Sequence, residues 1–350
     1  MWSVRAYKEE DRNQLIEIYR RQWGQSAAEK FASRWQWEFE SSPNNTHGVP
    51  NVLILQYENI VVGFLAGIAV NLCVEGKTLN MLWIVDYMTD PRHRGQGAKL
   101  VKEAMHAFTT IAGFPNNSLG NLLKRLGVFN ICSLPLFVRP LNMNYAVGKF
   151  IRNKYMIKIA GILLNLIFEL VFKPNLCQGV KDVSIIKASS FDEGIDRFWS
   201  QIHSDYHCIV VRNKEYLNWR FVACPLKLYT ILFAKKRGEI LGYIILRCAI
   251  QSGIKIGYIV DILAKQTQKE VTKCLISKAI ENFRKENVDI IMCYITNTRI
   301  QRLLNANGFF RWRSSCRLMG YTNASDLSVE AFKNPKNWFL TRGDSDLDIT

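Results

Sequence analysis

The chain contains an internal repeat, which restricts the fold to two similar halves. Residues 84–108 (IVDYMTDPRHRGQGAKLVKEAMHAF) align without a gap with residues 259–283 (IVDILAKQTQKEVTKCLISKAIENF), at an offset of 175. Each copy begins as an apolar strand and continues as a helix with apolar residues three and four positions apart. The 350 residues suffice for two domains, and 48% hydrophobic residues exclude a disordered chain.

The segments around the repeat also correspond. After it, an Asn begins and a Gly ends an apolar-striped helix in each half, at Asn116 to Gly127 and Asn297 to Gly308. Before it, each half has a hairpin pattern, with turns at 58–59 and 237–238. Helical patterns lie further upstream, at 8–23, 26–40, 191–201 and 214–222. Each half is therefore expected to run strand, helices, hairpin, strand, helix, strand, helix.

This order predicts an α/β protein of two tandem domains, each with a mixed central sheet flanked by helices. The predicted boundaries are 1–150 for the first domain, 151–178 for a long apolar linker helix, 179–325 for the second domain and 326–350 for a tail. Within the linker, residues 155–172 are mostly apolar, but Lys158, Asn165 and Glu169 interrupt them. Since a buried charge is costly in a bilayer, this helix is expected to be buried or to rest on a membrane surface rather than to span it.

The turn at the start of the first repeat helix has the character of a phosphate site. It reads DPRHRGQGAK over residues 90–99, directly after the strand. Glycines before a helix let backbone amides approach a ligand, and these amides lie at the positive end of the helix dipole. Arg92, Arg94 and Lys99 add positive charge. The turn is therefore predicted to bind a diphosphate group.

This turn resembles the pyrophosphate loop of the GNAT acetyltransferase superfamily, in which the pattern is Arg/Gln-x-x-Gly-x-Gly/Ala. Arg94 and Gly97 match it, and Lys99 replaces the last small residue. The whole chain resembles tandem GNAT proteins of bacterial surface-polysaccharide gene clusters. The resemblance implies acetyl-CoA as the acyl donor, bound by Tyr87, Thr89, Arg94, Gly95, Gln96, Gly97, Ala98, Lys99 and Asn116.

The second copy lacks these features. Its turn reads AKQTQKEV over residues 264–271, without a glycine and with Glu270 in place of Gly95. A carboxylate repels phosphate, and side chains prevent close approach to the backbone. The second half is therefore expected not to bind CoA and to form part of the acceptor cleft or to support the first half.

Acyl transfer to an amine requires a group that removes a proton from the ammonium form. The positions at which the superfamily often has a base are Trp83 and Val85, which cannot serve, and the nearest carboxylate is Asp86. Asp86 is the predicted base; its repeat partner Asp261 leaves a purely structural role open. The position of the family's acidic Tyr is Leu123, so the thiolate is expected to leave unaided or to take a proton from water.

The acceptor is expected to bind in the second half, where the segment 203–220 concentrates polar and aromatic residues. Its predicted substrate-binding residues are His203, Tyr206, Arg212, Trp219 and Arg220. A basic pocket suits a small amine such as an amino sugar or a nucleotide-linked amino sugar. The alternative is that this segment packs a helix.

The formal net charge of +16 is consistent with an acidic partner, and three functions remain open. The first is an acyl-CoA-dependent N-acyltransferase in surface-polysaccharide synthesis. The second is an aminoacyl-tRNA-dependent enzyme that modifies peptidoglycan, which the phosphate turn disfavours. The third is a non-catalytic acetyl-CoA-binding protein. DNA is not an expected partner, and the sequence leaves peripheral membrane contact by the helix at 155–172 open.

The nine cysteines show no CxxC and no Cys/His spacing, so neither a metal site nor a disulfide framework is expected. The first residues lack an apolar signal core. Both observations predict a cytoplasmic protein that is membrane-peripheral at most.

Overall fold

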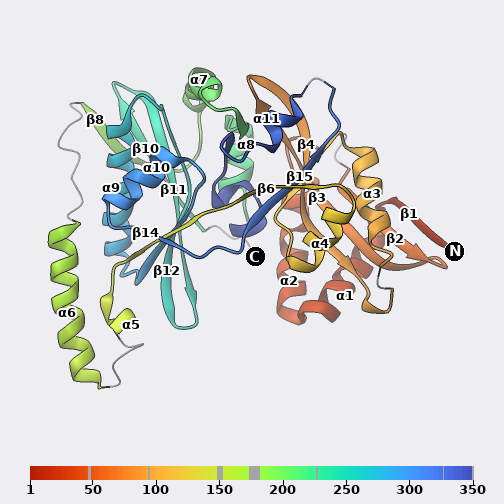
Figure 1. Cartoon of the computed structure of the whole chain (residues 1–350), viewed down its shortest axis with the longest axis horizontal. Coiled ribbons are helices and arrows are strands. Elements are labelled where there is room, and N and C mark those ends of the chain that lie inside the picture. The colour runs from red at the N-terminus through yellow and green to blue at the C-terminus, as the bar shows by residue number, and fades with distance from the viewer. Residues whose placement is uncertain are drawn as a thin grey trace. The chain divides into compact units, whose positions relative to one another are not determined.

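The computed structural model describes residues 1–45, 49–93, 95–147, 153–172, 182–225, 228–325 and 327–348 (Figure 1). The chain forms two compact units, each built on its own sheet. The first unit comprises residues 1–133, 206–227 and 316–338. The second unit comprises residues 134–205, 228–315 and 339–350.

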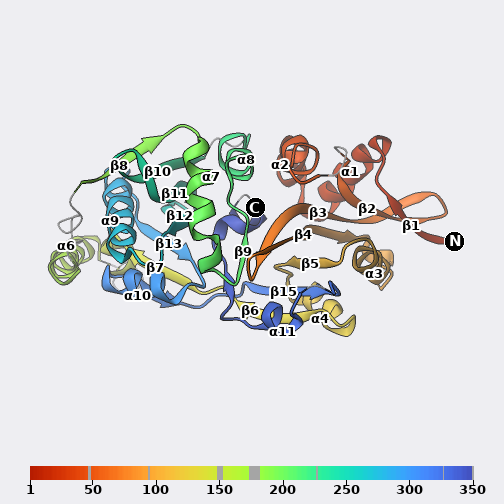
Figure 2. The same cartoon turned by 90° about the horizontal axis from the view of Figure 1, so that it is seen from above.

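In the first sheet, β4 and β5 pair in parallel, and the other neighbours along the path from β1 to β6 pair antiparallel. Its strands follow the order β1 (Trp2–Ala6), β2 (Asn51–Tyr57), β3 (Ile60–Val74), β4 (Lys77–Thr89), β5 (Thr110–Gly113), β15 (Arg317–Thr322) and β6 (Phe129–Ser133). A short strand, β9 (Cys208–Val210), pairs with the end of β3. Helices α1 (Arg12–Trp23) and α2 (Gln25–Trp35) pack on one face of the sheet, and α3 (Ala98–Ala107) and α4 (Asn117–Arg125) on the other (Figure 2).

Side-chain alternation along the strands supplies both faces of this sheet with a core. Phe64 and Ala66 of β3 belong to the core beneath α1 and α2. Leu65 between them belongs to the core beneath α3 and α4. A strand buried on both faces explains why β3 is apolar almost throughout.

The second sheet has the same plan. Its strands follow the order β14 (Phe310–Trp312), β7 (Leu136–Pro140), β13 (Ile290–Tyr294), β12 (Ile254–Ala264), β11 (Glu239–Gln251), β10 (Tyr229–Lys236) and β8 (Val183–Ala188). Only β12 and β13 are paired in parallel among its described strands. The second unit contains the helices α5 (Met143–Val147), α6 (Lys154–Val171), α7 (Glu193–Ile202), α9 (Lys269–Lys285) and α10 (Thr298–Ala306). The first unit also contains α8 (Lys214–Leu217) and α11 (Val329–Lys333), and β16 (Trp338–Phe339) pairs with β9 of the first sheet. The predicted class, α/β with two mixed sheets flanked by helices, is confirmed.

The predicted repeat is present in the backbone. The pairing of β3 with β4 shifts register so that Val85 is an extra residue, and the pairing of β11 with β12 does the same at Val260. These two bulges are 175 residues apart, the offset of the sequence alignment. The predicted hairpin turns at 58–59 and 237–238 have positive φ at both residues.

The predicted helix boundaries in the two halves are also confirmed. Asn116 caps α4 and Asn297 caps α10 through their side-chain oxygens. Gly127 and Gly308 follow these helices with φ of +83° and +76°, which favours glycine. The equivalent helices therefore begin and end alike.

The two halves exchange strands. β7 follows the first half in the chain but pairs with β13 and β14 of the second sheet. β15 follows the second half but pairs with β5 and β6 of the first. The contiguous boundaries predicted at 150 and 179 therefore differ from the observed units, because the partners of an edge strand are not encoded in its own sequence.

The chain enters the second unit at residue 134, before α6 begins. Helix α6 lies within the second unit, so the structure does not show a helix that links the two units. In the part of the chain described, no helix is long and apolar enough to cross a membrane.

Candidate functional site

The candidate site of the first unit begins where β4 and β5 separate. These parallel strands pair from Leu82 with Ile111 to Ile84 with Gly113. Beyond this point β4 continues to Thr89, paired with β3 on its other side. One edge of β4 is thus left without a strand partner among the described residues. The backbone N–H and C=O groups of such an edge can form hydrogen bonds with an extended ligand.

The predicted phosphate turn lies at the end of this edge. Gly95 has φ of +91°, a conformation that glycine adopts without strain. Gly97 is the N-cap of α3 and has no side chain with which to cap the opening amides. Lys99 is exposed in the first turn of α3. Arg94 lies outside the described residues, so its predicted role is not tested.

Arg92 is already engaged within the turn. Its guanidinium donates to Asp90 at 2.6 Å, and its backbone N–H donates to the same carboxylate at 2.9 Å. These hydrogen bonds lower the pKa of Asp90 to about 2. The charge of Arg92 is therefore largely balanced by Asp90, and Lys99 is the better candidate for a described phosphate ligand.

The side chain of Tyr87 lies against the start of α3. A methyl group added at Gly97 would collide with the Tyr87 hydroxyl and would lie 2.8 Å from Cγ2 of Thr89. The predicted cofactor residues Tyr87, Thr89 and Gly97 are therefore in direct proximity. Burial raises the pKa of Tyr87, so its hydroxyl remains protonated at neutral pH. The facing Gly97 is the sequence signal that could have indicated a side-chain role for Tyr87.

Asp86 lies on the opposite face of β4, beneath α1 and α2. Its Oδ1 accepts a hydrogen bond from the Tyr19 hydroxyl at 3.2 Å, and its Oδ2 accepts one from Nη2 of Arg34 at 3.0 Å. Arg34 also pairs with Glu38 at 3.2 Å. Burial raises the pKa of Asp86, while Arg34 and Tyr19 oppose this effect. Two buried carboxylates thus share one guanidinium, an arrangement that favours retention of a proton.

The repeat partner of Asp86 has a different environment. Asp261 accepts hydrogen bonds from the Tyr243 hydroxyl at 2.8 Å and from the Ile262 backbone N–H at 3.0 Å. These contacts favour a role in the fold for Asp261. Asp86 has different partners, Tyr19 of α1 and Arg34 of α2, so the role of Asp261 does not carry over to it.

Asn116 lies at the start of α4, after the end of β5. Its side-chain oxygen accepts a hydrogen bond from the Leu119 backbone N–H at 2.9 Å. The residue is exposed. Its capping role is therefore shown, and its role toward a cofactor remains a prediction.

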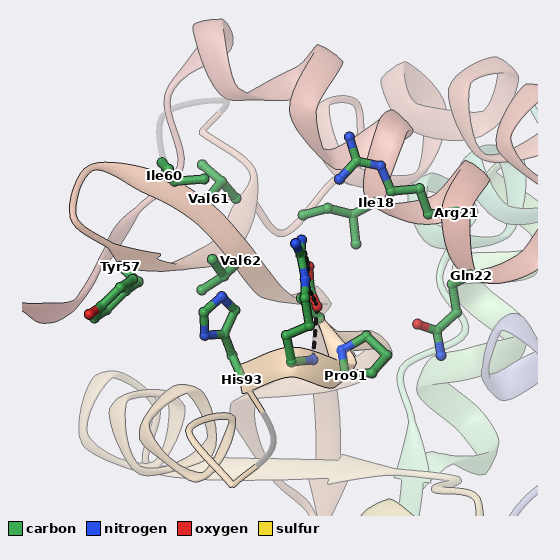
Figure 3. Close-up of a pocket in the computed structure, with 11 residues that line it drawn as sticks. Ile18, Arg21, Gln22, Tyr57, Ile60, Val61, Val62, Pro91 and His93 are labelled. Carbon is green, nitrogen blue, oxygen red and sulfur yellow. Dashed lines mark hydrogen bonds and ion pairs between the residues drawn. The ribbon is translucent and has the colours of Figure 1, made fainter.

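A cavity of about 480 Å³ lies on the α1 side of the turn (Figure 3). It is lined by Ile18, Arg21 and Gln22 of α1, by Tyr57, Ile60, Val61 and Val62 of the β2–β3 hairpin, and by Asp90, Pro91, Arg92 and His93 of the turn. The ring of His93 packs edge-on against Trp2 at 5.1 Å. Its lining thus combines apolar side chains with the cations Arg21 and Arg92, and no residue of the predicted cofactor set lines it.

The predicted acceptor residues do not form one described site. Trp219 stacks on Trp37 at 5.3 Å, and the Arg220 guanidinium lies 5.5 Å from the Trp37 ring centre. Arg212 donates to the Val210 carbonyl oxygen at 2.8 Å. These residues and Tyr206 are buried in the first unit, whereas His203 lies in the second. This placement favours packing, and substrate binding by these residues remains a prediction.

In the second unit, β12 and β13 correspond to β4 and β5, and the C-terminal tail lies where these strands separate. The C-terminal tail pairs there through a bridge between Ile295 and Thr341. Leu340 donates to Oγ1 of Thr296 at 2.8 Å and accepts from the Thr296 N–H at 3.1 Å. Arg342 lies over the Tyr258 ring of β12 at 4.3 Å. The chain's own tail therefore occupies the side of β13 that would have to receive a ligand.

Glu270, at the second turn, pairs with Lys273 at 3.0 Å. Its carboxylate occupies the position of Gly95 in the repeat. Among the described residues, no group of three or more His, Cys, Asp or Glu side chains is arranged to hold a metal ion.

Comparison with known proteins agrees with this geometry. Residues 3–110 match the model of the acetyltransferase (GNAT) domain. No curated protein sequence matches the chain. The match ends at β5 and therefore contains β4, the turn and α3.

Solved structures are similar over nearly the whole chain. A GCN5-related N-acetyltransferase from Anabaena variabilis has a TM-score of 0.62 at 12% identity, covering 91% of this chain and 72% of its own. A probable N-acyltransferase of unknown function from Enterococcus faecalis gives the same values. N-myristoyltransferase from Saccharomyces cerevisiae, with bound myristoyl-CoA, has a TM-score of 0.57 at 14% identity, covering 97% and 84%. Residues 3–110 thus match a GNAT acetyltransferase domain, and the chain shares its fold with these structures.

Proposed function

We propose that this chain is an N-acyltransferase that transfers an acyl group from acyl-CoA to a small amine. The observation that carries the proposal is the separation of β4 from β5 beside the glycine turn and the start of α3. These features lie within the residues that match the GNAT domain. Acetyl-CoA is the donor to test first, and the similarity to an N-myristoyltransferase makes longer acyl chains the next.

In this proposal the carrier binds the first unit only. Its diphosphate lies on the amides at residues 95–99, with the charges of Arg94 and Lys99 beside it. Its extended arm follows the open edge of β4 at Tyr87 and Thr89, toward Asn116. The second unit binds no carrier, because its turn lacks glycine and its C-terminal tail pairs beside β13.

The chemical step requires two proton movements. The amine nitrogen attacks the thioester carbonyl and forms the C–N bond, the C–S bond breaks, and CoA leaves as a thiolate. The nitrogen then loses its second proton, which balances the proton that the thiolate takes up. An alkyl ammonium has a pKa of about 10, so a base must first take its proton. Asp86 is the proposed base, held by Tyr19 and Arg34. The Tyr87 hydroxyl lies at Gly97, the diphosphate end of the proposed carrier site, so the thiolate is proposed to take its proton from water.

A nucleotide-linked amino sugar of surface polysaccharide is the acceptor that we propose to test first. The net charge of +16 supports an anionic acceptor. On this proposal the protein acts in the cytoplasm. An aminoacyl-tRNA donor and a non-catalytic role remain as alternatives, and the following experiments separate them.

Calorimetry with acetyl-CoA tests the binding part of the proposal. One site per chain is expected, and Lys99→Glu should weaken it about tenfold or more, because it reverses a charge beside the diphosphate. Lys102→Glu makes the same change one turn further along α3 and should bind almost as the unmodified protein does. Absence of acetyl-CoA binding together with salt-sensitive tRNA binding would favour the aminoacyl-tRNA alternative.

Release of free thiol from acetyl-CoA tests the transfer step. Addition of an amino-sugar nucleotide should accelerate the release. Binding of acetyl-CoA without release for any amine would identify a binding protein instead of an enzyme.

A further inference from the structure

Helix α6 turns its small and polar residues inward, toward the rest of the second unit. Gly161 packs against the side chain of Asn144 of α5. Asn165 accepts a hydrogen bond from the Met143 backbone N–H at 3.0 Å. This orientation is the reverse of an ordinary surface helix, which turns its apolar side inward.

An ion-pair cluster fixes the rotation of α6. Glu169, the only carboxylate of this helix, pairs with Arg139 of β7 at 3.2 Å and with Arg284 of α9. The Arg139 guanidinium also lies over the Phe168 ring at 4.9 Å. A buried arginine cannot lose its partner without a large cost, so the inward side of α6 is strongly determined.

The opposite side of α6 is a continuous apolar surface. Exposed apolar residues run from Tyr155 to Val171 and include Ile159, Leu163 and Ile167. Leu170 is 79% exposed and Tyr155 is 82% exposed. No described part of the chain covers them. A contiguous apolar surface of this length is uncommon on a protein that meets only water.

Strand β14 extends this surface beyond the end of α6. Phe310 contacts Phe168 and Phe172 at ring-centre distances of 6.1 and 5.8 Å. Trp312 lies two residues further, on the same side of the strand, and is 65% exposed. The one carboxylate of α6 and β14, Glu169, is paired with arginines and does not add negative charge to this surface. The chain as a whole carries a net charge of +16.

We propose that the outer side of α6, together with β14, docks the protein onto an anionic lipid bilayer. The helix lies in the plane of the membrane surface, with its leucine and isoleucine side chains among the acyl chains. Tyr155 and Trp312 have the amphipathic rings that favour the bilayer interface, and the net charge of +16 favours anionic headgroups. A second copy is a poorer occupant, because it carries the same net charge of +16 and is repelled, whereas an anionic bilayer is attracted.

Sedimentation of the full chain with lipid vesicles tests the proposal. Vesicles that contain phosphatidylglycerol should retain the protein, and vesicles of phosphatidylcholine alone should retain less. The double variant L163E/I167E should lower binding to the anionic vesicles about tenfold or more, because it puts charge into the apolar surface. Both residues point outward, so the thermal transition should change little.

A matched control is available in the same unit. Ile186 and Ile250 are exposed apolar residues of β8 and β11, and the double variant I186E/I250E should bind vesicles as the unmodified protein does. Equal loss in both double variants, or no vesicle binding by the unmodified chain, would overturn the proposal. So would a dimer in sedimentation equilibrium that L163E/I167E dissociates while vesicle binding is unaffected. None of these results depends on acyl-CoA binding.

Discussion

The indole N–H of Trp37 donates to the carbonyl oxygen of Trp219 at 2.7 Å, and the indole N–H of Trp219 donates to the carbonyl oxygen of Trp37 at 2.8 Å. The two rings stack with 20° between their planes. The residues occupy the second position of two π-helical segments, Gln36–Glu40 (QWEFE) and Asn218–Val222 (NWRFV). The pair is therefore reciprocal, as expected of corresponding segments from the two halves.

This pair predicts that Trp219 stabilises the fold. Trp219→Phe should lower the free energy of unfolding by about 1–3 kcal/mol, because it leaves the buried carbonyl of Trp37 without its donor. Urea unfolding measures the change. Trp23→Phe, which alters an exposed tryptophan of the same unit, should have little effect. A raised KM for the acceptor with unchanged stability would instead support the substrate-binding role predicted from the sequence.

The contact between Tyr87 and Gly97 predicts that Gly97 cannot be enlarged. Gly97→Ala should weaken acetyl-CoA binding and destabilise the fold by about 1–3 kcal/mol, since the new methyl group collides with the Tyr87 hydroxyl. Tyr87→Phe in the same chain should restore part of the loss by removing that hydroxyl. Calorimetry and thermal unfolding measure both effects.

Gly120 provides the control for this prediction. A methyl group there meets its nearest atom at 3.6 Å, an ordinary contact distance. Gly120→Ala should therefore leave acetyl-CoA binding unchanged. If Gly97→Ala binds acetyl-CoA normally, the turn does not receive the diphosphate as proposed.

The environment of Asp86 predicts its effect on pH dependence. Asp86→Asn should reduce turnover about 100-fold or more while acetyl-CoA binding is retained, as expected for loss of a base. In the unmodified enzyme the rate should rise with pH as Asp86 ionises, with a pKa above the usual value. Asp261→Asn should keep turnover. Equal rates for the unmodified and Asp86→Asn enzymes would assign Asp86 to the fold alone.

The same shift has a consequence for stability. Because the pKa of Asp86 is raised in the folded state, this carboxyl group holds its proton above pH of about 3.9 in the folded protein, whereas in the unfolded chain it loses the proton there. Its contribution to the free energy of unfolding is therefore present at low pH and is lost as pH rises through the folded pKa. Urea unfolding at a series of pH values should show this loss in the unmodified protein and not in Asp86→Asn.

Local sequence signals predicted much of this fold. The repeat at offset 175, the helix-capping Asn116 and Asn297 and the hairpin turns depend on neighbouring residues, and the structure has them where expected. Strand exchange could not be predicted in this way. β7 and β15 are short apolar strands whose partners lie far away in the chain, so nothing in their own residues selects one sheet over the other.

The candidate site was predicted less completely than the fold. The glycine turn has a local sequence pattern and could be predicted. The cluster around Asp86 joins Tyr19 and Arg34 of two helices to a strand, and residues so far apart in the chain form no pattern in the sequence. The correspondence of residues 37 and 219 was missed because its offset is 182, so a gapless alignment does not contain it. The residue type of Trp219 predicts contact with substrate, and its stacking on Trp37 is visible only in the structure.

The contacts of the C-terminal tail predict that Arg342 stabilises the second unit. Arg342 donates to Asp348 at 3.0 Å, and Arg247 lies 3.4 Å from the same fully buried carboxylate. Arg342→Ala should lower the free energy of unfolding by about 3–5 kcal/mol, because it removes one partner of a buried charge. Lys336→Ala changes an exposed cation just before the tail and should have almost no effect.

Measurement of acetyl-CoA binding distinguishes a loss of stability in Arg342→Ala from a loss of the proposed carrier site. Because the tail closes the second unit and the carrier site lies in the first, Arg342→Ala should still bind one acetyl-CoA per chain at a temperature where it remains folded. A second binding event in this variant would mean that the tail excludes a ligand which the second unit could otherwise hold. Unchanged stability in Arg342→Ala would show that the contacts of Arg342 with Asp348 and Tyr258 are not what holds the tail beside β13.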